Sequence, residues 1–191
     1  MATKTELTRA AHALLLPILK TQGFSADKLV FHKTGASGVA PLISLDLDSK
    51  TKASFKVHVG VEVRSPGSPR RPGDKGFAAH RLLSRGGVTQ SDCTWPCDTS
   101  ERMSRSLEGV LAALQAHGLP WIAGLATLDD VLKEVPENYS VARTQLALEA
   151  GDAARAREFI LQGLERLQPL AAEPWAAADI AELKRLEQSL D

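Results

Sequence analysis

The side chains best suited to chemistry lie on one strongly alternating segment and shortly after it. His58 and Glu62 belong to the segment from Phe55 to Arg64, and His80 and Arg81 follow further along the chain. Imidazoles and carboxylates exchange protons and bind metal ions, so these four residues would carry a hydrolase or a nucleic-acid enzyme. Within one strand, however, His58 and Glu62 would stand about 13 Å apart, which is too far for a single metal ion.

No motif elsewhere in the chain supports a catalytic centre. The sequence shows no serine or cysteine nucleophile in a strand–turn–helix elbow and no glycine-rich phosphate loop. Cys93 and Cys97 stand in Cys-Thr-Trp-Pro-Cys without a nearby histidine, so they do not complete a four-ligand zinc site. We therefore expect no enzymatic activity, no cofactor and no resident metal. We also expect two reduced thiols, with a disulfide as the alternative.

A basic, irregular segment follows the alternating one. Residues 65–76 hold three prolines and three glycines, which excludes regular structure and predicts an exposed loop. Arg64, Arg70 and Arg71 make this region positive. Nucleic-acid binding normally adds aromatic platforms to such a field, yet aromatic residues form only 5% of the chain and none lies in the loop. We expect a solvated loop, with an anionic protein surface rather than nucleic acid as its possible partner.

The three tryptophans all stand next to prolines, as Trp95-Pro96, Pro120-Trp121 and Pro174-Trp175. Tryptophan is enriched among the residues that contribute most to protein–protein binding, and it is equally at home in a core. We expect Trp121 and Trp175 to be core residues. Trp95 lies in a segment with no regular pattern, so it is the candidate anchor for a partner.

Charge is distributed unevenly along the chain. Residues 1–100 carry 14 Lys and Arg against 8 Asp and Glu, and residues 101–191 carry 9 against 15. The halves thus bear net charges of +6 and −6, which indicates either two different partner surfaces or mutual attraction between the halves. No apolar run approaches the roughly 20 residues that cross a bilayer. A short run near the N-terminus lacks a cleavage site, so we expect a cytoplasmic protein.

The alternating segment predicts the element that holds the chemical side chains. Its apolar residues occupy every second position, namely Phe55, Val57, Val59, Val61 and Val63. Successive side chains of a strand point to opposite faces, so the segment predicts an antiparallel sheet with one face covered by helices. The other face should be wet and should present Lys56, His58, Glu62 and Arg64 next to the basic loop.

Helices and further strands complete the predicted fold. We expect a helix over residues 5–22, kinked at Pro17 and ended by Gly23, then strands over 29–33 and 42–47, the second in a hairpin with the alternating segment. A helix should then run to about residue 117, where Gly118 ends it. A helical hairpin (140–150 and 152–168) and a last helix from Pro174 follow. The prediction is an α+β domain, residues 1–135, with a helical C-terminal extension, residues 137–191.

Short motifs in residues 5–135 resemble, in their order, a bacterial domain family of unknown function that includes toxin-immunity proteins. They are Gly23-Phe24 after the first helix, Phe31 in a strand, Phe-x-Val-x-x-Gly-Val from Phe55 to Val61, Arg81, Trp95, and Leu119-Pro120-Trp121. The resemblance implies an α+β fold and carries no catalytic motif. It also implies that the protein binds and neutralises a toxin.

These observations favour a non-enzymatic protein-binding function, with a cognate toxin or effector protein as partner and neither membrane nor nucleic acid. An adaptor or effector chaperone acting through the helical tail is the alternative outside the immunity class. The acidic helical half would suit a basic toxin such as a nuclease, whereas the wet sheet face and basic loop would suit an acidic one. The candidate partner-binding residues are Lys56, His58, Glu62, Arg64, Arg70, Arg71, His80, Arg81 and Trp95.

Overall fold

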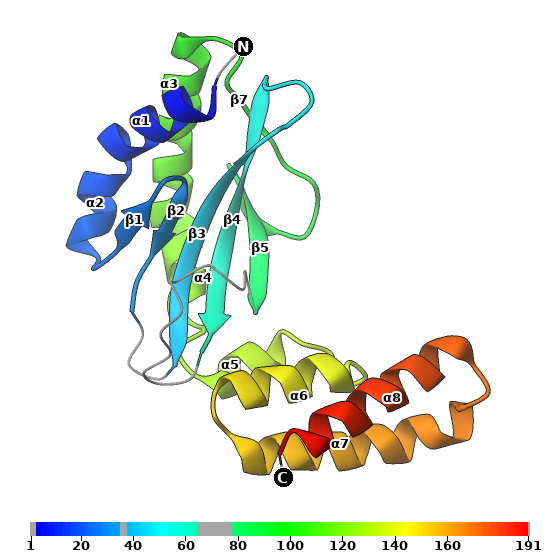
Figure 1. The fold of residues 1–191 in the computed structure, drawn as a ribbon. Helices are drawn as coiled ribbons and strands as arrows, with labels where there is room; N and C mark the ends of the chain where they lie inside the picture. Colours follow the sequence, from blue (N-terminus) through cyan, green and yellow to red (C-terminus); the bar gives the residue numbers. More distant parts are fainter. Residues whose placement is uncertain (1–2, 35–37, 65–77, 191) are drawn as a thin grey trace.

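The protein has an α+β fold in which an antiparallel sheet is followed by a helical extension (Figure 1). The computed structural model describes residues 3–34, 38–64 and 78–190. The strands in these ranges pair in the order β1-β2-β3-β4-β5-β6, and β7 also pairs with β4. Their bounds are β1 Ser25–Asp27, β2 Val30–His32, β3 Val39–Leu47, β4 Ser54–Val63, β5 Ala79–Ser84, β6 Gly87–Thr89 and β7 Trp95–Pro96.

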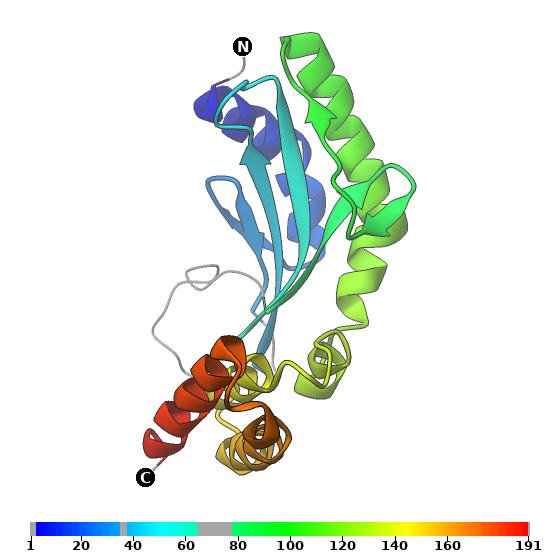
Figure 2. The ribbon, with the colours of Figure 1, turned by 90° about the vertical axis from the view of Figure 1, so that its right-hand side faces the viewer.

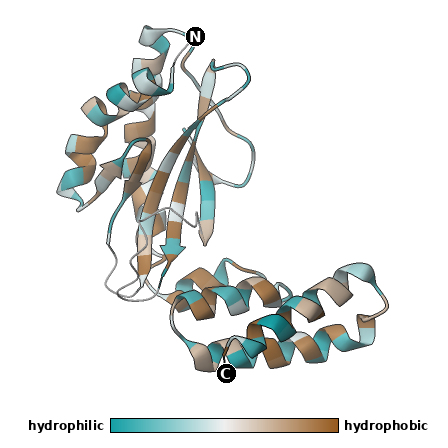
Figure 3. Ribbon diagram, viewed as in Figure 1, coloured by the Kyte–Doolittle hydropathy of each residue, from teal (hydrophilic) through white to brown (hydrophobic). Residues whose placement is uncertain are grey.

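Strand β4 is the centre of the sheet and confirms the prediction made from alternation. Its five apolar residues, Phe55 to Val63 at every second position, are at most 1% exposed, so one face of the strand is fully covered. Antiparallel pairing with β3 over nine residue pairs fixes its register, with His58 opposite Ser44. Figure 3 shows β3 and β4 as largely hydrophobic strands interrupted by hydrophilic positions. The predicted hairpin of these strands is therefore present, while β1, β5, β6 and β7 were not predicted.

Three helices cover this apolar face (Figures 1 and 2). They are α1 Lys4–Leu14, α2 Leu16–Thr21 and α3 Ser100–Ala113, and α1 packs beside α3. The predicted first helix is divided at Leu15, because Pro17 occupies the first turn of α2, where its missing N–H is tolerated. Gly23, at φ +85°, follows that helix in the left-handed conformation, as predicted.

Gly118 does not end the following helix, contrary to the prediction. The chain continues from α3 through a π-helical turn, Leu114–Gly118, into α4, Leu119–Ala123. A Cβ on Gly118 would lie 3.0 Å from a methyl group of Leu114 and 3.5 Å from one of Val59. Glycine is therefore present because the helix approaches the sheet closely at this point, and not because the helix stops. The segment Leu119-Pro120-Trp121 is accordingly helical.

Helix α5, Leu128–Lys133, leads into the C-terminal extension. The extension consists of α6 Ser140–Glu149, α7 Ala153–Leu167, the 3-10 turn η2 Gln168–Leu170 and α8 Pro174–Gln188. Thr127 and Asp130 form a capping box at α5, and the Asp152 side chain accepts from the backbone N–H of Arg155 at the start of α7. The predicted helical hairpin and last helix are confirmed.

The extension packs on the α+β part through a shared core. The main hydrophobic cluster runs from α1 and the sheet through Val131 and Leu132 of α5 to Leu146 and Phe159 of α6 and α7. A second, smaller cluster joins α7 to α8. Among the described residues, no helix has the length and apolar character needed to cross a membrane.

Candidate functional site

The open face of the sheet brings several of the predicted residues together. Lys56 forms an ion pair with Asp92 at 2.6 Å between Nζ and Oδ1, and His58 Nε2 lies 3.2 Å from Asp46 Oδ2. The rings of His58 and His80 are 5.5 Å apart between centroids. The hydrogen bond from His58 lowers the pKa of Asp46, while burial, His58 and Arg81 lower the pKa of His80. These side chains form a linked polar surface that spans β3, β4 and β5.

Glu62 differs from its prediction, because its side chain is buried. It is only 3% exposed, and Ala40, its partner residue on β3, is buried as well. A period of two assigns a residue to one side of a sheet but says nothing about what covers that side. Glu62 is therefore not a solvated surface carboxylate, and Arg64 beyond the strand end is partly buried.

His80 and Arg81 point to opposite faces of the sheet, so the four residues of the enzyme hypothesis do not converge. His80 pairs with Gly60 on the open face, whereas Arg81 pairs with Val59 on the covered face. Arg81 Nη2 donates to Glu134 Oε2 at 2.5 Å, and its guanidinium lies 5.7 Å from the Trp121 ring. Arg81 thus links β5 to the end of α5 and takes no part in the open face.

The tryptophan predictions were wrong for Trp95 and Trp175. Trp95 is 1% exposed, and its Nε1 donates to the Leu83 carbonyl oxygen at 3.0 Å, which makes it a core residue. Trp175 is 55% exposed. Both tryptophans stand next to a proline, so that feature does not distinguish the buried residue from the exposed one. Trp95 is carried into the core by the pairing of β7 with Phe55 of β4, and this short pairing has no local sequence pattern.

The remaining predicted residues add no further centre. Cys93 and Cys97 are both free thiols, and burial raises the pKa of each above its ordinary value. Arg70 and Arg71 lie outside the described residues. No group of three or more His, Cys, Asp or Glu side chains within the described ranges is arranged to hold a metal ion.

The large apolar side chains with the greatest exposure in the described ranges all belong to the helical extension, which the sequence indicated as a docking surface only for the adaptor or effector chaperone alternative. They are Tyr139, Leu161, Leu170 and Trp175. Leu170 and Trp175 flank one tight turn, closed by a hydrogen bond from the Glu173 N–H to the Leu170 carbonyl oxygen at 2.9 Å. We call these two residues the apolar tip. Figure 1 shows the junction of α7 and α8 at the end of the extension farthest from the sheet.

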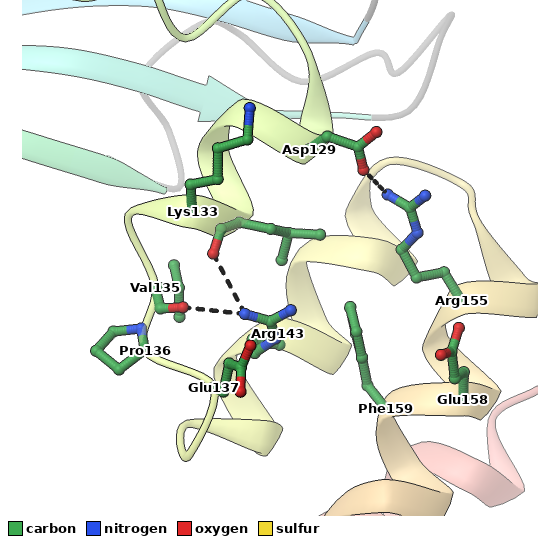
Figure 4. A pocket seen from close by; sticks show the side chains of 10 residues that line it. Asp129, Lys133, Val135, Pro136, Glu137, Arg143, Arg155, Glu158 and Phe159 are labelled. Carbon is green, nitrogen blue, oxygen red and sulfur yellow. Dashed lines mark hydrogen bonds and ion pairs between the residues drawn. The ribbon is translucent and has the colours of Figure 1, made fainter.

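A hollow of about 530 Å³ lies between α5, α6 and α7, and we call it the helical groove (Figure 4). Charged side chains surround its apolar part, which Leu132, Val135, Pro136 and Phe159 provide. The Arg143 guanidinium lies 4.7 Å from the centre of the Phe159 ring. The groove is separate from the open sheet face and belongs wholly to the extension and its entry helix α5.

Comparisons of the chain with protein-family models, with curated proteins and with solved structures find no match. The resemblance to the immunity-related family therefore rests on the short sequence motifs alone. The apolar tip, the helical groove and the polar sheet face are the surfaces from which a function has to be inferred.

Proposed function

We propose that this protein is a non-enzymatic protein-binding protein that docks a partner through its helical extension. The observation that supports this proposal is the apolar tip, where Trp175 and Leu170 are 55% and 42% exposed. An exposed tryptophan and an exposed leucine on either side of one turn offer apolar area to a partner, and the tryptophan has little conformational freedom to lose. Such a pair at the end of a packed helical lobe suits the centre of an interface better than the interior of a catalytic cleft.

We further propose that the partner is a cognate bacterial toxin and that the protein acts in the cytoplasm as an immunity protein. The ordered motifs from Gly23-Phe24 to Leu119-Pro120-Trp121 support this assignment. The net charge of −6 over residues 101–191 supports a basic toxin, because opposite charges speed the encounter and select the partner. A stable complex of this kind would bury about 800 Å² on each partner.

Genetic neutralisation tests the immunity proposal. The product of the neighbouring gene should stop growth when it is expressed alone, and growth should return when this protein is expressed with it. The two purified proteins should form a 1:1 complex. A neighbouring product that is harmless alone, or that remains toxic in the presence of this protein, would rule out the immunity role.

An adaptor or effector chaperone is the second candidate, and the same apolar tip supports it. Such a protein would bind a partner that is not toxic and would promote its delivery or assembly. The neutralisation experiment separates the two functions, since only the immunity protein restores growth. Both functions predict that loss of Trp175 weakens partner binding.

A further inference from the structure

We propose that the helical groove holds an arginine or lysine side chain from a basic segment of the protein partner. This inference rests on the proposed protein-binding function and goes beyond it by naming the chemistry of the contact. Figure 4 shows charged side chains from α5, α6 and α7 arranged around the hollow, with Phe159 between Arg143 and Glu158. The charge of the ligand that fits this hollow depends on which of these side chains already have partners.

The three bases of the groove are already engaged. Arg155 forms an ion pair with Asp129, and its Nε lies 3.6 Å from Asp152 Oδ2. Lys133 is bonded to Asp130 at 2.8 Å. Arg143 donates from Nη1 to the carbonyl oxygens of Leu132 and Val135, at 3.3 Å and 3.1 Å, and so holds the end of α5 against α6.

Two carboxylates of the groove have no basic partner. Glu137 forms no ion pair within the described part of the chain, and Glu158 accepts a hydrogen bond only from the Gln162 amide, at 3.0 Å. Both side chains are exposed, so they are free to turn toward a ligand. The lining itself holds three carboxylates, Asp129, Glu137 and Glu158, and three bases, Lys133, Arg143 and Arg155. Asp130 and Asp152, which pair with lining bases, add two negative charges beside the groove, and Arg166, which donates to the Glu137 carbonyl oxygen, adds one positive charge. The groove and its immediate neighbours therefore carry an excess of one negative charge.

A basic side chain matches both features of this lining. Its methylene stem would lie against Pro136 and Val135, the accessible apolar residues of the lining, while its charged head would meet the carboxylates of Glu137 and Glu158. An anionic ligand would meet the carboxylates of Glu137 and Glu158, and two of the three lining bases, Lys133 and Arg155, already bind carboxylates. The groove therefore favours a cationic segment, in agreement with the acidic character of this half of the chain.

The test uses the full-length protein and a short peptide with two arginines separated by glycines, blocked at both ends. Its matched analogue carries citrulline, which keeps the shape of arginine without the charge. The arginine peptide should bind and should shift the amide resonances of residues 132–135, 137 and 155–159 in ¹H–¹⁵N spectra, whereas the citrulline peptide should not. Replacing both acids, as Glu137→Gln with Glu158→Gln, should weaken binding by about tenfold or more.

The control removes the same number of charges from exposed positions elsewhere on the extension, as Glu165→Gln with Glu187→Gln. This variant should bind the peptide nearly as well as the wild type does. Equal loss in both double variants, shifts outside the groove, or equal binding of the citrulline peptide would each overturn the inference. If the toxin binds and the groove variant does not weaken that complex, the inference fails and the proposed function stands. If the arginine peptide binds in the groove but no toxin is neutralised, the immunity role fails instead.

Discussion

His80 shows how an individual side chain on the open sheet face couples to the stability of the fold. Partial burial lowers its pKa from the ordinary value of 6.5, and the charges of His58 and Arg81 act in the same direction. The ring of His58, which itself bonds Asp46, lies against it. The folded protein therefore holds His80 neutral at a pH where the unfolded chain already binds a proton.

The free energy of unfolding should consequently fall as the pH decreases through 6.5, and His80→Gln should reduce this fall. The sign follows from the lowered pKa, because the unfolded state binds more protons than the folded state in this range. Urea denaturation of both proteins between about pH 7.5 and pH 5 measures the effect. If the two proteins lose stability equally over this interval, His80 is not held neutral by the fold.

The sequence predicted most elements correctly wherever their local patterns are strong. Strand β4 alternates over its full length, and α7 begins at the Asp152 cap where a helix was predicted, so the existence and type of both elements followed directly. The predictions failed where long-range packing determines the structure. Gly118 permits a close approach of its helix to Val59 and does not end that helix, and Trp95 is buried because β7 pairs with β4.

The candidate site was less predictable than the fold. Alternation placed Lys56 and His58 on one face, where the structure has them, but it did not show that Glu62 is buried or that Arg81 faces the helices. Neither the apolar tip nor the helical groove has a motif. Both arise from the way α6, α7 and α8 pack, and a single sequence does not report which faces of helices remain uncovered.

Gly163 tests the packing of the three helices of the extension. A Cβ at this position would lie 2.7 Å from Leu183 Cδ1 and 2.7 Å from Ser140 Cβ, so Gly163→Ala must push α7 away from α6 and α8. Helix propensity alone would favour alanine by about 1 kcal/mol, but overpacking costs about 1–3 kcal/mol. We expect a net loss of about 1 kcal/mol in the free energy of unfolding, measured by urea denaturation.

Ala178→Gly, at an exposed interior position of the neighbouring helix α8, provides the reference for propensity. It should cost about 1 kcal/mol without any change in packing. A stabilised Gly163→Ala protein would mean that α7 does not approach its neighbours as closely as the structure describes.

At the scale of the whole molecule, the position of the extension relative to the sheet depends on how the two parts are attached. The shared hydrophobic core provides most of this attachment, and the partly buried ion pair of Arg81 with Glu134 joins β5 directly to the end of α5. Because the tip and the groove both lie on the extension, this attachment orients the proposed binding surface relative to the sheet.

A double-mutant cycle with Arg81→Met and Glu134→Gln should give a coupling energy of about 1 kcal/mol. The side chains are 23% and 25% exposed, so the pair is screened less than a surface pair, yet it is not fully desolvated. Denaturation of the two single variants, the double variant and the wild type supplies the four free energies. Simple additivity of the single effects would show that the pair does not hold the two parts together.

The affinity of the purified protein for the product of its neighbouring gene is the most direct test of the proposed function. Trp175→Ala should raise the dissociation constant by about 30-fold or more, because loss of a dominant interface tryptophan costs about 2 kcal/mol or more. Lys56→Ala, on the open sheet face, should change it little. A complex that is weakened by Lys56→Ala and unaffected by Trp175→Ala, or the absence of any complex, would contradict binding through the helical extension.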